Sequence, residues 1–387
     1  MSRRTWRTGP WTADATALTV VMVLLLVFGL VMSFSASFVG AATTGDPFAV
    51  FRRQATWASI GVVAFVAIAH IAPTTWRVLA WPLLIGSLAG LVAVLVPGVG
   101  VERFGSSRWI GIGPIVVQPS EVAKLGVLVW LADVLERKRP ANGQLPAIDH
   151  LLVPALPLLG ATSLLVMLQP DLGTAILLAM IVIAVLWIEG LPVRLVTWMA
   201  AGGTVIVLLL ARVAPYRVAR ITGWLAPESD PLGSGFQLLQ SRYALGSGGL
   251  WGLGLGSSRG KWQFLPNPET DFIFAIIGEE LGLVGALAVL VLFSALLYLG
   301  LRIAFRAEHG FSRTVAFAIT TWLVGQALVN IATVTGLLPI TGVTLPLVSV
   351  GGSSLIVTLV ALGMLVAIAR TAPAAAGVTR QAHGGPR

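Results

Sequence analysis

The chain has 387 residues, of which 56% are hydrophobic and only 11% are charged. Soluble domains carry roughly 25% charged residues, so the composition excludes an ordinary soluble protein and predicts a polytopic membrane protein. The net charge of +9 would suggest nucleic acid in a soluble protein. In a membrane protein we expect it to reflect topology, and no nucleic-acid partner is predicted. There is no cysteine, which excludes thiol nucleophiles, disulfides and cysteine-based metal sites.

Ten apolar stretches are candidates to cross a membrane, which takes about 20 apolar residues. In chain order they are residues 17–39, 54–71, 75–96, 119–135, 151–168, 172–187, 191–211, 271–301, 314–334 and 346–369. We expect the first to be a span rather than a signal peptide, because no short apolar region with a small-residue cleavage site follows the start. The predicted fold is an all-α polytopic membrane protein with ten transmembrane helices and one long extracytoplasmic loop.

The predicted organisation has three parts. Residues 1–16 form a cytoplasmic N-terminal segment, and residues 17–370 form the ten-helix domain, whose large loop covers residues 213–270. Residues 371–387 lack an apolar period, so we expect a disordered cytoplasmic tail.

Lys and Arg residues in the loops predict the orientation, because cytoplasmic loops are enriched in them. With an even number of spans both termini lie on one side, and the loops of that side hold most of these residues. The short opposite loops hold only Arg52, Arg53, Arg103 and Arg108. Both termini are therefore predicted to be cytoplasmic. Polar residues of the outer loops converge on one face, which favours a single site there.

Thr270 and Asp271 open the eighth predicted span. One interpretation is helix capping, with Thr270 as N-cap and Asp271 in the first turn. The other is that Asp271 is a general base at the membrane–water boundary, where partial desolvation would raise its pKa. On a continuous helix Glu279 would lie within roughly a quarter turn of Asp271, and Glu280 on nearly the opposite face. A cleft lined by Asp271 and Glu279 is therefore geometrically feasible.

The stretch Gln118-Pro-Ser-Glu-Val-Ala-Lys124 starts the fourth span, and its proline suits a first helical turn. Glu121 and Lys124 are spaced i, i+3 and can pair on one face. The pair could merely neutralise itself, but a purely structural ion pair in lipid is a poor stabiliser. The alternative is that Lys124 holds an anionic substrate and Glu121 sets its orientation.

Two further motifs lie at predicted turns. Gln169-Pro-Asp-Leu-Gly-Thr174 is either a helix-hairpin turn, with Asp171 capping the sixth span, or part of the site. The glycine-rich loop, residues 246–256, resembles a phosphate-binding loop, but no strand precedes it and the spacing is loose. A flexible loop is favoured, although its backbone N–H groups could hold a phosphate together with Arg259 and Lys261.

The last motif, residues 345–354, places serines and glycines at a helix start. These residues permit close packing between helices, or they could expose backbone N–H groups to an anion. Trp109, before the fourth span, is typical of a membrane-belt anchor.

Together these motifs resemble the SEDS family of shape, elongation, division and sporulation proteins, represented by FtsW and RodA. The resemblance runs along nearly the whole chain. Its pieces are residues 29–37, Arg108-Trp109-Ile110, residues 118–124, 169–174, 243–256 and 265–274 with Glu279 and Glu280, and residues 345–354. Residues 254–262 and 342–346 are more similar to the FtsW branch. Two positions depart from the family pattern, because Glu269 replaces a histidine and Val350 a tyrosine.

The resemblance implies a peptidoglycan glycosyltransferase in the cytoplasmic membrane of a bacterium, with its active site on the extracytoplasmic side. Its substrate would be lipid II, a disaccharide-peptide on undecaprenyl diphosphate. Its partners would be a class B penicillin-binding protein and other cell-division proteins. The resemblance further implies that Asp271 is catalytic and that Glu121, Lys124 and Asp171 line the same cavity. The other supporting residues we expect are Arg108, Trp109, Gln118, Ser120, Lys261, Glu279, Ser349 and Ser353.

The resulting hypothesis is inverting glycosyl transfer for septal synthesis. Asp271 would take the proton from the acceptor 4-hydroxyl, and undecaprenyl diphosphate would leave. Either Lys124 with loop arginines or a divalent cation (Mg²⁺ or Mn²⁺) held by oxygen ligands would stabilise the leaving group. No organic cofactor is expected. Two alternatives stay open, namely a lipid II flippase and a non-catalytic scaffold that recruits a transpeptidase.

Overall fold

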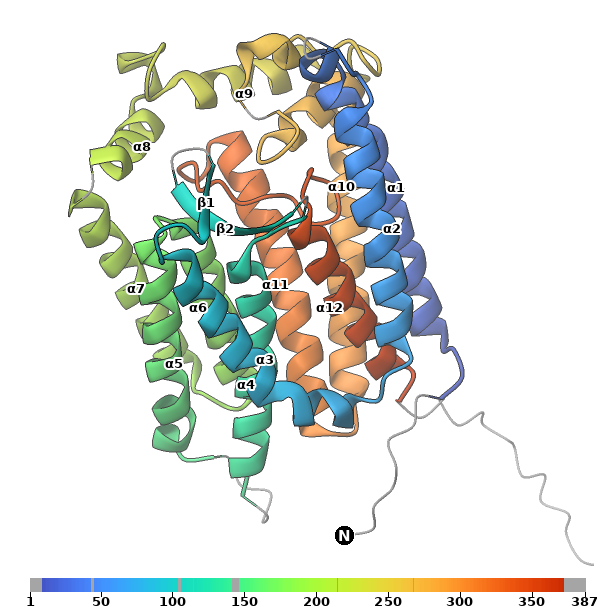
Figure 1. Ribbon diagram of the computed structural model, residues 1–387, viewed down its shortest axis with the longest axis vertical. Coiled ribbons are helices and arrows are strands. Elements are labelled where there is room, and N and C mark those ends of the chain that lie inside the picture. The colour runs from blue at the N-terminus through green and yellow to red at the C-terminus, as the bar shows by residue number, and fades with distance from the viewer. Residues whose placement is uncertain are drawn as a thin grey trace, which may run out of the picture.

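The computed structural model describes residues 9–42, 45–103, 106–113, 115–140, 146–213, 215–266 and 268–371. Ten helices of at least 17 residues form a bundle in this part of the chain (Figure 1). They are α1 (Ala13–Ala42), α2 (Ala49–Ala69), α3 (Pro73–Val94), α4 (Pro119–Lys138), α5 (Ile148–Leu168), α6 (Leu172–Ile188), α7 (Val193–Val213), α10 (Ile273–Arg306), α11 (Gly310–Thr335) and α12 (Ser353–Ala369). Each corresponds to one predicted span.

Apolar length explains most of these helices. Five of the described helices (α1, α3, α5, α10 and α11) are long and apolar enough to cross a membrane, while α6, α12 and most of α7 are shorter apolar helices. The prediction of an all-α polytopic membrane protein is confirmed.

Smaller elements cover one end of the bundle. Between α7 and α10 lie α8 (Pro215–Leu225), the 3₁₀ turn η1 (Pro227–Ser229), α9 (Phe236–Ser247) and the π-helical turn η2 (Gly260–Phe264), at the top of Figure 1. A sheet was not predicted. Its antiparallel strands are β1 (Gly100–Arg103), β2 (Ser106–Ile112) and β3 (Ile115–Val117), in the order β1-β2-β3. Strands this short leave no clear alternation in the sequence.

Both ends of the described chain lie together at the opposite end of the bundle (Figure 1). The Gly9 N–H donates to the carbonyl of Arg370 at 3.0 Å. The Arg370 guanidinium donates to the carbonyls of Gly9 at 3.1 Å and Ala69 at 2.8 Å. Two ends on the same side of the bundle require that the chain crosses the bundle an even number of times between them. The predicted disorder of the C-terminal tail concerns residues that, beyond Thr371, lie outside the described part.

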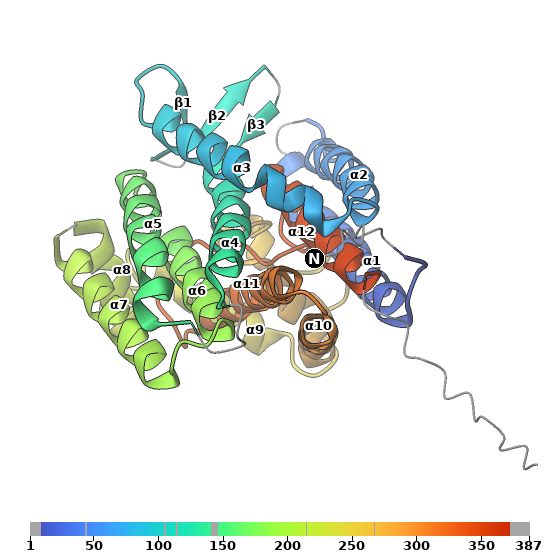
Figure 2. The ribbon, with the colours of Figure 1, turned by 90° about the horizontal axis from the view of Figure 1, so that it is seen from below.

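Helix α11 occupies the middle of the bundle, where α4, α6, α10 and α12 pack on it (Figure 2). The α11–α12 loop, residues 336–352, follows it. Helix α12 begins at Ser353, so the predicted start of this span at Pro346 was wrong. The chain turns first, because the Ser349 hydroxyl accepts the Leu345 N–H at 2.8 Å and Leu347 has φ +65°.

Helix α10 is interrupted at Gly282, whose φ of +65° and ψ of −161° are not helical. At this break the carbonyls of Glu279 and Glu280 accept the N–H groups of Leu253 and Gly254, both at 3.0 Å. Two N–H groups just after the break donate in return to carbonyls of the glycine-rich loop. The loop that the sequence favoured as flexible thus finds backbone partners in the open helix.

The break should be sensitive to a single methyl group. A Cβ on Gly282 would lie 2.4 Å from the Gly252 nitrogen and 2.5 Å from the Leu250 oxygen. Because the φ angle is also unfavourable, we expect Gly282→Ala to cost about 2 kcal/mol or more of stability. Thermal melting of the purified protein in detergent measures this. Gly160→Ala is the control, since its Cβ would meet nothing within 4 Å, and equal melting of the two variants would contradict the prediction.

Candidate active site

Asp271 lies in a turn that precedes α10. The helix begins only at Ile273, and its N-cap position is Phe272, without a side-chain capping bond. The capping interpretation of Thr270 was therefore wrong. The Thr270 hydroxyl instead donates to Oδ1 of Asp271 at 2.9 Å.

The turn that carries Asp271 is fixed by its backbone. The carbonyls of residues 269, 270 and 271 accept, in this order, the Val350 N–H at 2.8 Å, the Ser349 hydroxyl at 2.5 Å and the Asn330 side-chain amide at 2.8 Å. These donors come from the α11–α12 loop and from α11, so the surrounding framework prevents the turn from joining the helix. The carboxylate of Asp271 remains available for chemistry.

Electrostatics distinguishes the two acids of this turn from surface carboxylates. Burial raises the pKa of Asp271, and the Thr270 hydrogen bond and the charge of Arg220 oppose the shift. Burial also raises the pKa of Glu269, where the Asp271 carboxylate adds to the shift and Arg53 opposes it. A raised pKa brings a carboxyl group closer to the range that suits general base catalysis near neutral pH.

Lys124 and Glu121 form a buried ion pair at the start of α4. Their side chains are 1% and 9% exposed, and Nζ lies 2.9 Å from the Glu121 carboxylate. The predicted i, i+3 pairing is confirmed, as is the place of Pro119 in the first turn. Nζ also donates to Oε1 of Gln326 at 3.2 Å and lies 4.9 Å from the centroid of the Trp322 ring. The cation is held from two helices.

Asp171 and Gln118 join the starts of α4, α6 and α12. Asp171 accepts the Thr174 N–H at 3.1 Å, which confirms that it caps α6. The Gln118 side-chain amide donates to the Ser120 hydroxyl at 3.1 Å and to Asp171 at 3.4 Å. The Gln118 backbone N–H donates to the Ser353 hydroxyl at 3.0 Å. Four of the expected supporting residues are thus in one hydrogen-bonded group.

Arg108, on β2, fixes the hairpin between α5 and α6. Its guanidinium donates to the carbonyls of Gln169 at 3.0 Å and Pro170 at 2.5 Å, and one nitrogen lies 3.9 Å from Asp171. Arg108 therefore holds the loop that carries Asp171. Trp109 follows it on β2, opposite Val101 on β1, as part of the small sheet.

Glu279 has a different setting from the one expected. Its carboxylate accepts the Ser258 hydroxyl at 2.5 Å and the Arg259 N–H at 2.8 Å. The quarter-turn estimate failed because Asp271 precedes the helix and so does not share its angular spacing. Glu279 anchors the loop that runs into η2.

Lys261 is likewise engaged by the loop. Its Nζ pairs with the fully buried Glu280 at 3.2 Å and also contacts the carbonyl of Gly256. Glu280 further accepts the Ser35 hydroxyl of α1 at 2.6 Å. Glu280 therefore faces the same loop as Glu279, and the paired Lys261 ties this loop to α10 and, through Glu280, to α1.

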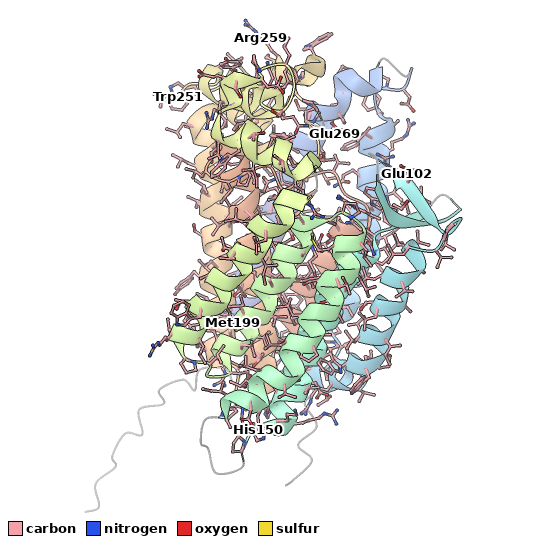
Figure 3. All side chains as sticks on the ribbon, turned by 90° about the vertical axis from the view of Figure 1, so that its left-hand side faces the viewer. Glu102, His150, Met199, Trp251, Arg259 and Glu269 are labelled. Atoms are coloured by element: carbon pink, nitrogen blue, oxygen red, sulfur yellow. The ribbon has the colours of Figure 1, made fainter. Side chains whose placement is uncertain are left out.

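The loop covers the end of the bundle at which Asp271 lies. Figure 3 shows Trp251 and Arg259 at this end of the bundle, Glu269 beneath the loop, and His150 at the opposite end. Within the described ranges, no group of three or more His, Asp or Glu side chains could hold a metal ion.

Three buried polar residues near the site were missed by the sequence analysis. Gln54 of α2 accepts the Gly351 N–H at 3.1 Å, while Gln326 and Asn330 of α11 contact Lys124 and the Asp271 backbone. A usable signal existed, because polar side chains inside apolar helices are costly and mark functional positions.

The fold and these groups define a class of protein, a polytopic helical membrane protein with buried acids and the buried lysines Lys124 and Lys261 near a loop-covered end. Residues 15–373 match the family model FtsW/RodA/SpoVE, described as "Cell cycle protein". The chain belongs to this family.

Relatives match over almost the whole chain. Stage V sporulation protein E of Bacillus subtilis strain 168 is 43% identical over 354 residues, which cover 91% of this chain and 96% of that protein. The probable peptidoglycan glycosyltransferase FtsW of Mycobacterium tuberculosis strain H37Rv is 39% identical over 361 residues, covering 93% of this chain and 68% of that protein.

Solved structures share the fold. A chain from a structure on the structural coordination of polymerization and crosslinking by a peptidoglycan synthase complex has a TM-score of 0.75 and 32% identity, covering 93% of this chain and 98% of that chain. The rod shape determining protein RodA of Thermus thermophilus has a TM-score of 0.68 and 29% identity, and the match covers 91% of this chain and 95% of that chain.

Proposed function

We propose that this chain is a peptidoglycan glycosyltransferase that polymerises lipid II at the outer face of the cytoplasmic membrane. The observation that carries the proposal is the setting of Asp271, a partly buried carboxylate on a turn whose three carbonyls are fixed. In the described part of the chain Asp271 takes part in no ion pair, whereas Glu121, Asp171 and Glu280 each face a cation. The names of the FtsW relatives support the same activity.

Asp271 is the general base of the proposed reaction. It accepts the proton of the acceptor 4-hydroxyl while that oxygen attacks the anomeric carbon of the donor. The bond from that carbon to undecaprenyl diphosphate breaks, and the leaving group takes the electron pair. The α link becomes a β link, so no covalent enzyme intermediate is needed.

Lys124 supplies positive charge to the leaving diphosphate. Its Nζ lies 2.9 Å from both carboxylate oxygens of Glu121 and 3.2 Å from Oε1 of Gln326. Because an ammonium group has three N–H donors, a phosphate oxygen takes the place of one Glu121 oxygen when the substrate binds. Hydrogen bonds of this charged kind are stronger than neutral ones. A divalent cation, if bound, would add neutralisation at the diphosphate; the described residues contain no group of three His, Asp or Glu side chains that could hold it.

We further propose septal synthesis beside a class B penicillin-binding protein, with both termini cytoplasmic. The adjacency of Gly9 and Arg370 supports the placement of both ends on one side, and the distribution of Lys and Arg favours the cytoplasm. The similarity to a chain from a peptidoglycan synthase complex supports a partner that crosslinks the strands.

A lipid II polymerisation assay on the purified protein tests the proposal. Wild type is expected to form glycan polymer in detergent, and Asp271→Ala is expected to form none. Leaflet exchange of lipid II without polymer would instead indicate a flippase. Normal growth of cells that carry Asp271→Ala would indicate a scaffold. A parallel assay with chelator tests the requirement for a cation.

The pH profile should report the buried base. The carboxylate is the active form, so a raised pKa moves the acid limb of kcat/KM above the ordinary aspartate value of 3.8. Arg220 lowers the pKa of Asp271, so Arg220→Met should move the limb to still higher pH. The charged groups that influence this site are Arg220, which acts on Asp271, and Glu269, which interacts with Asp271 and is itself influenced by Arg53. Initial rates between about pH 4 and pH 8 measure the shift, and an acid limb at or below the ordinary value contradicts the assignment.

A further inference from the structure

Three large polar side chains form a stripe on the central helix α11. Trp322, Gln326 and Asn330 are spaced four residues apart and so share one face of the helix. They are 0%, 4% and 0% exposed. Buried polar groups cost free energy unless they are hydrogen-bonded, so the partners of this stripe indicate why it exists.

Gln326 connects the buried lysine to the α11–α12 loop. Its Oε1 accepts Nζ of Lys124 at 3.2 Å and Nε1 of Trp322 at 2.9 Å. Its Nε2 donates to the carbonyl of Thr344 at 3.0 Å. One carboxamide therefore fixes the cation and the loop together.

Asn330, one turn further along, connects the same loop to Asp271. Its Nδ2 donates to the carbonyl of Val343 at 2.7 Å and to the carbonyl of Asp271 at 2.8 Å. Its Oδ1 is buried without a hydrogen-bond partner among the described residues. An unpaired buried acceptor is unfavourable for stability, so the two bonds from Nδ2, which join the loop to the Asp271 turn, are what this asparagine contributes.

We propose that Asn330 and Gln326 are positioning residues for the transfer reaction. Together they fasten the backbone of Asp271 and the ammonium group of Lys124 to the same helix, α11. The base and the cation then keep a fixed distance from each other during turnover. The inference rests on the proposed function, because it needs Asp271 as the base. Neither residue touches the reacting atoms in this account.

The size of the effect follows from geometry. Asn330 bonds the backbone of Asp271 itself, so its removal frees the turn on the side that faces α11. A displacement of about 1 Å at a reacting group can cost about 10²-fold in rate. Because the substrate contacts are left in place, the loss should fall on kcat and not on KM.

Asn330→Leu tests the inference, since leucine keeps the volume but lacks both N–H donors. We expect kcat for lipid II polymerisation to fall about 10²-fold, with KM changed by less than about threefold. Asn330→Gln keeps the donors and should recover part of kcat. Thr320→Val is the control, because Thr320 is fully buried on α11 and its hydroxyl bonds its own helix; its kcat should be unchanged.

Several results would overturn the positioning role. These are wild-type kcat in Asn330→Leu, a loss that resides wholly in KM, or equal losses in the Leu and Gln variants. If Asp271→Asn itself polymerises normally, the proposed function is wrong as well. If Asp271→Asn is inactive while Asn330→Leu works normally, only the positioning role fails. If Asn330→Leu does not fold, Gln326→Met decides, with an expected loss in kcat of about tenfold and wild-type kcat as the contrary result.

Discussion

Asp271→Asn is expected to reduce the rate of lipid II polymerisation by about 10²–10⁴-fold, the usual contribution of a general base. The substitution is isosteric, and the amide oxygen can still accept the Thr270 hydroxyl. The three carbonyl contacts of the turn involve backbone and are unaffected. Initial rates on purified protein, together with melting temperatures, measure activity and folding separately.

Glu269→Gln is the matched control for this prediction. Glu269 lies on the same turn, and burial raises its pKa in the same way, but the proposed mechanism gives it no proton to accept. We expect Glu269→Gln to retain most of the activity. A rate above about a tenth of wild type in a well-folded Asp271→Asn protein would exclude the general-base role.

Lys124→Met is expected to abolish polymerisation and to destabilise the protein by about 3–5 kcal/mol. Methionine replaces the long apolar stem, but the 9% exposed Glu121 side chain is left without its cation. The double variant Glu121→Gln/Lys124→Met removes both charges and should recover most of the stability. Because the cation is still missing, it should not recover the activity.

This pair of variants separates the two interpretations of the ion pair. A self-neutralising structural pair predicts that the double variant regains both stability and activity, and that result would contradict a substrate role for Lys124. Arg306→Met serves as control, because its pair with Asp14 involves an arginine side chain that is 52% exposed. An exposed pair of this kind contributes about 0–1 kcal/mol, so activity should be kept.

The sequence predicted those features that depend on local chemistry. Apolar length alone located all ten helices, and Pro119 and Asp171 marked the first turns of α4 and α6 because their roles are local. The i, i+3 pairing of Glu121 with Lys124 was predictable for the same reason.

Features that depend on distant partners were not predictable. The turn before α10 exists because α11 and the α11–α12 loop supply donors to its carbonyls, and no local pattern reveals that. Glu279 was assigned to the wrong surroundings for this reason. For Asn330 and Gln326 the sequence indicates only that a polar side chain inside an apolar helix is costly. Their hydrogen-bond partners can be identified only from the packed structure.

The interruption at Gly282 divides α10 into a short and a long helical segment. Hydrogen bonds beside the break run to the glycine-rich loop, and the short segment that follows Asp271 is buried along its whole length from Ile273 to Glu280. The glycine-rich loop is thereby joined, through Glu279 and Glu280, to the helical segment that begins just after the turn of Asp271.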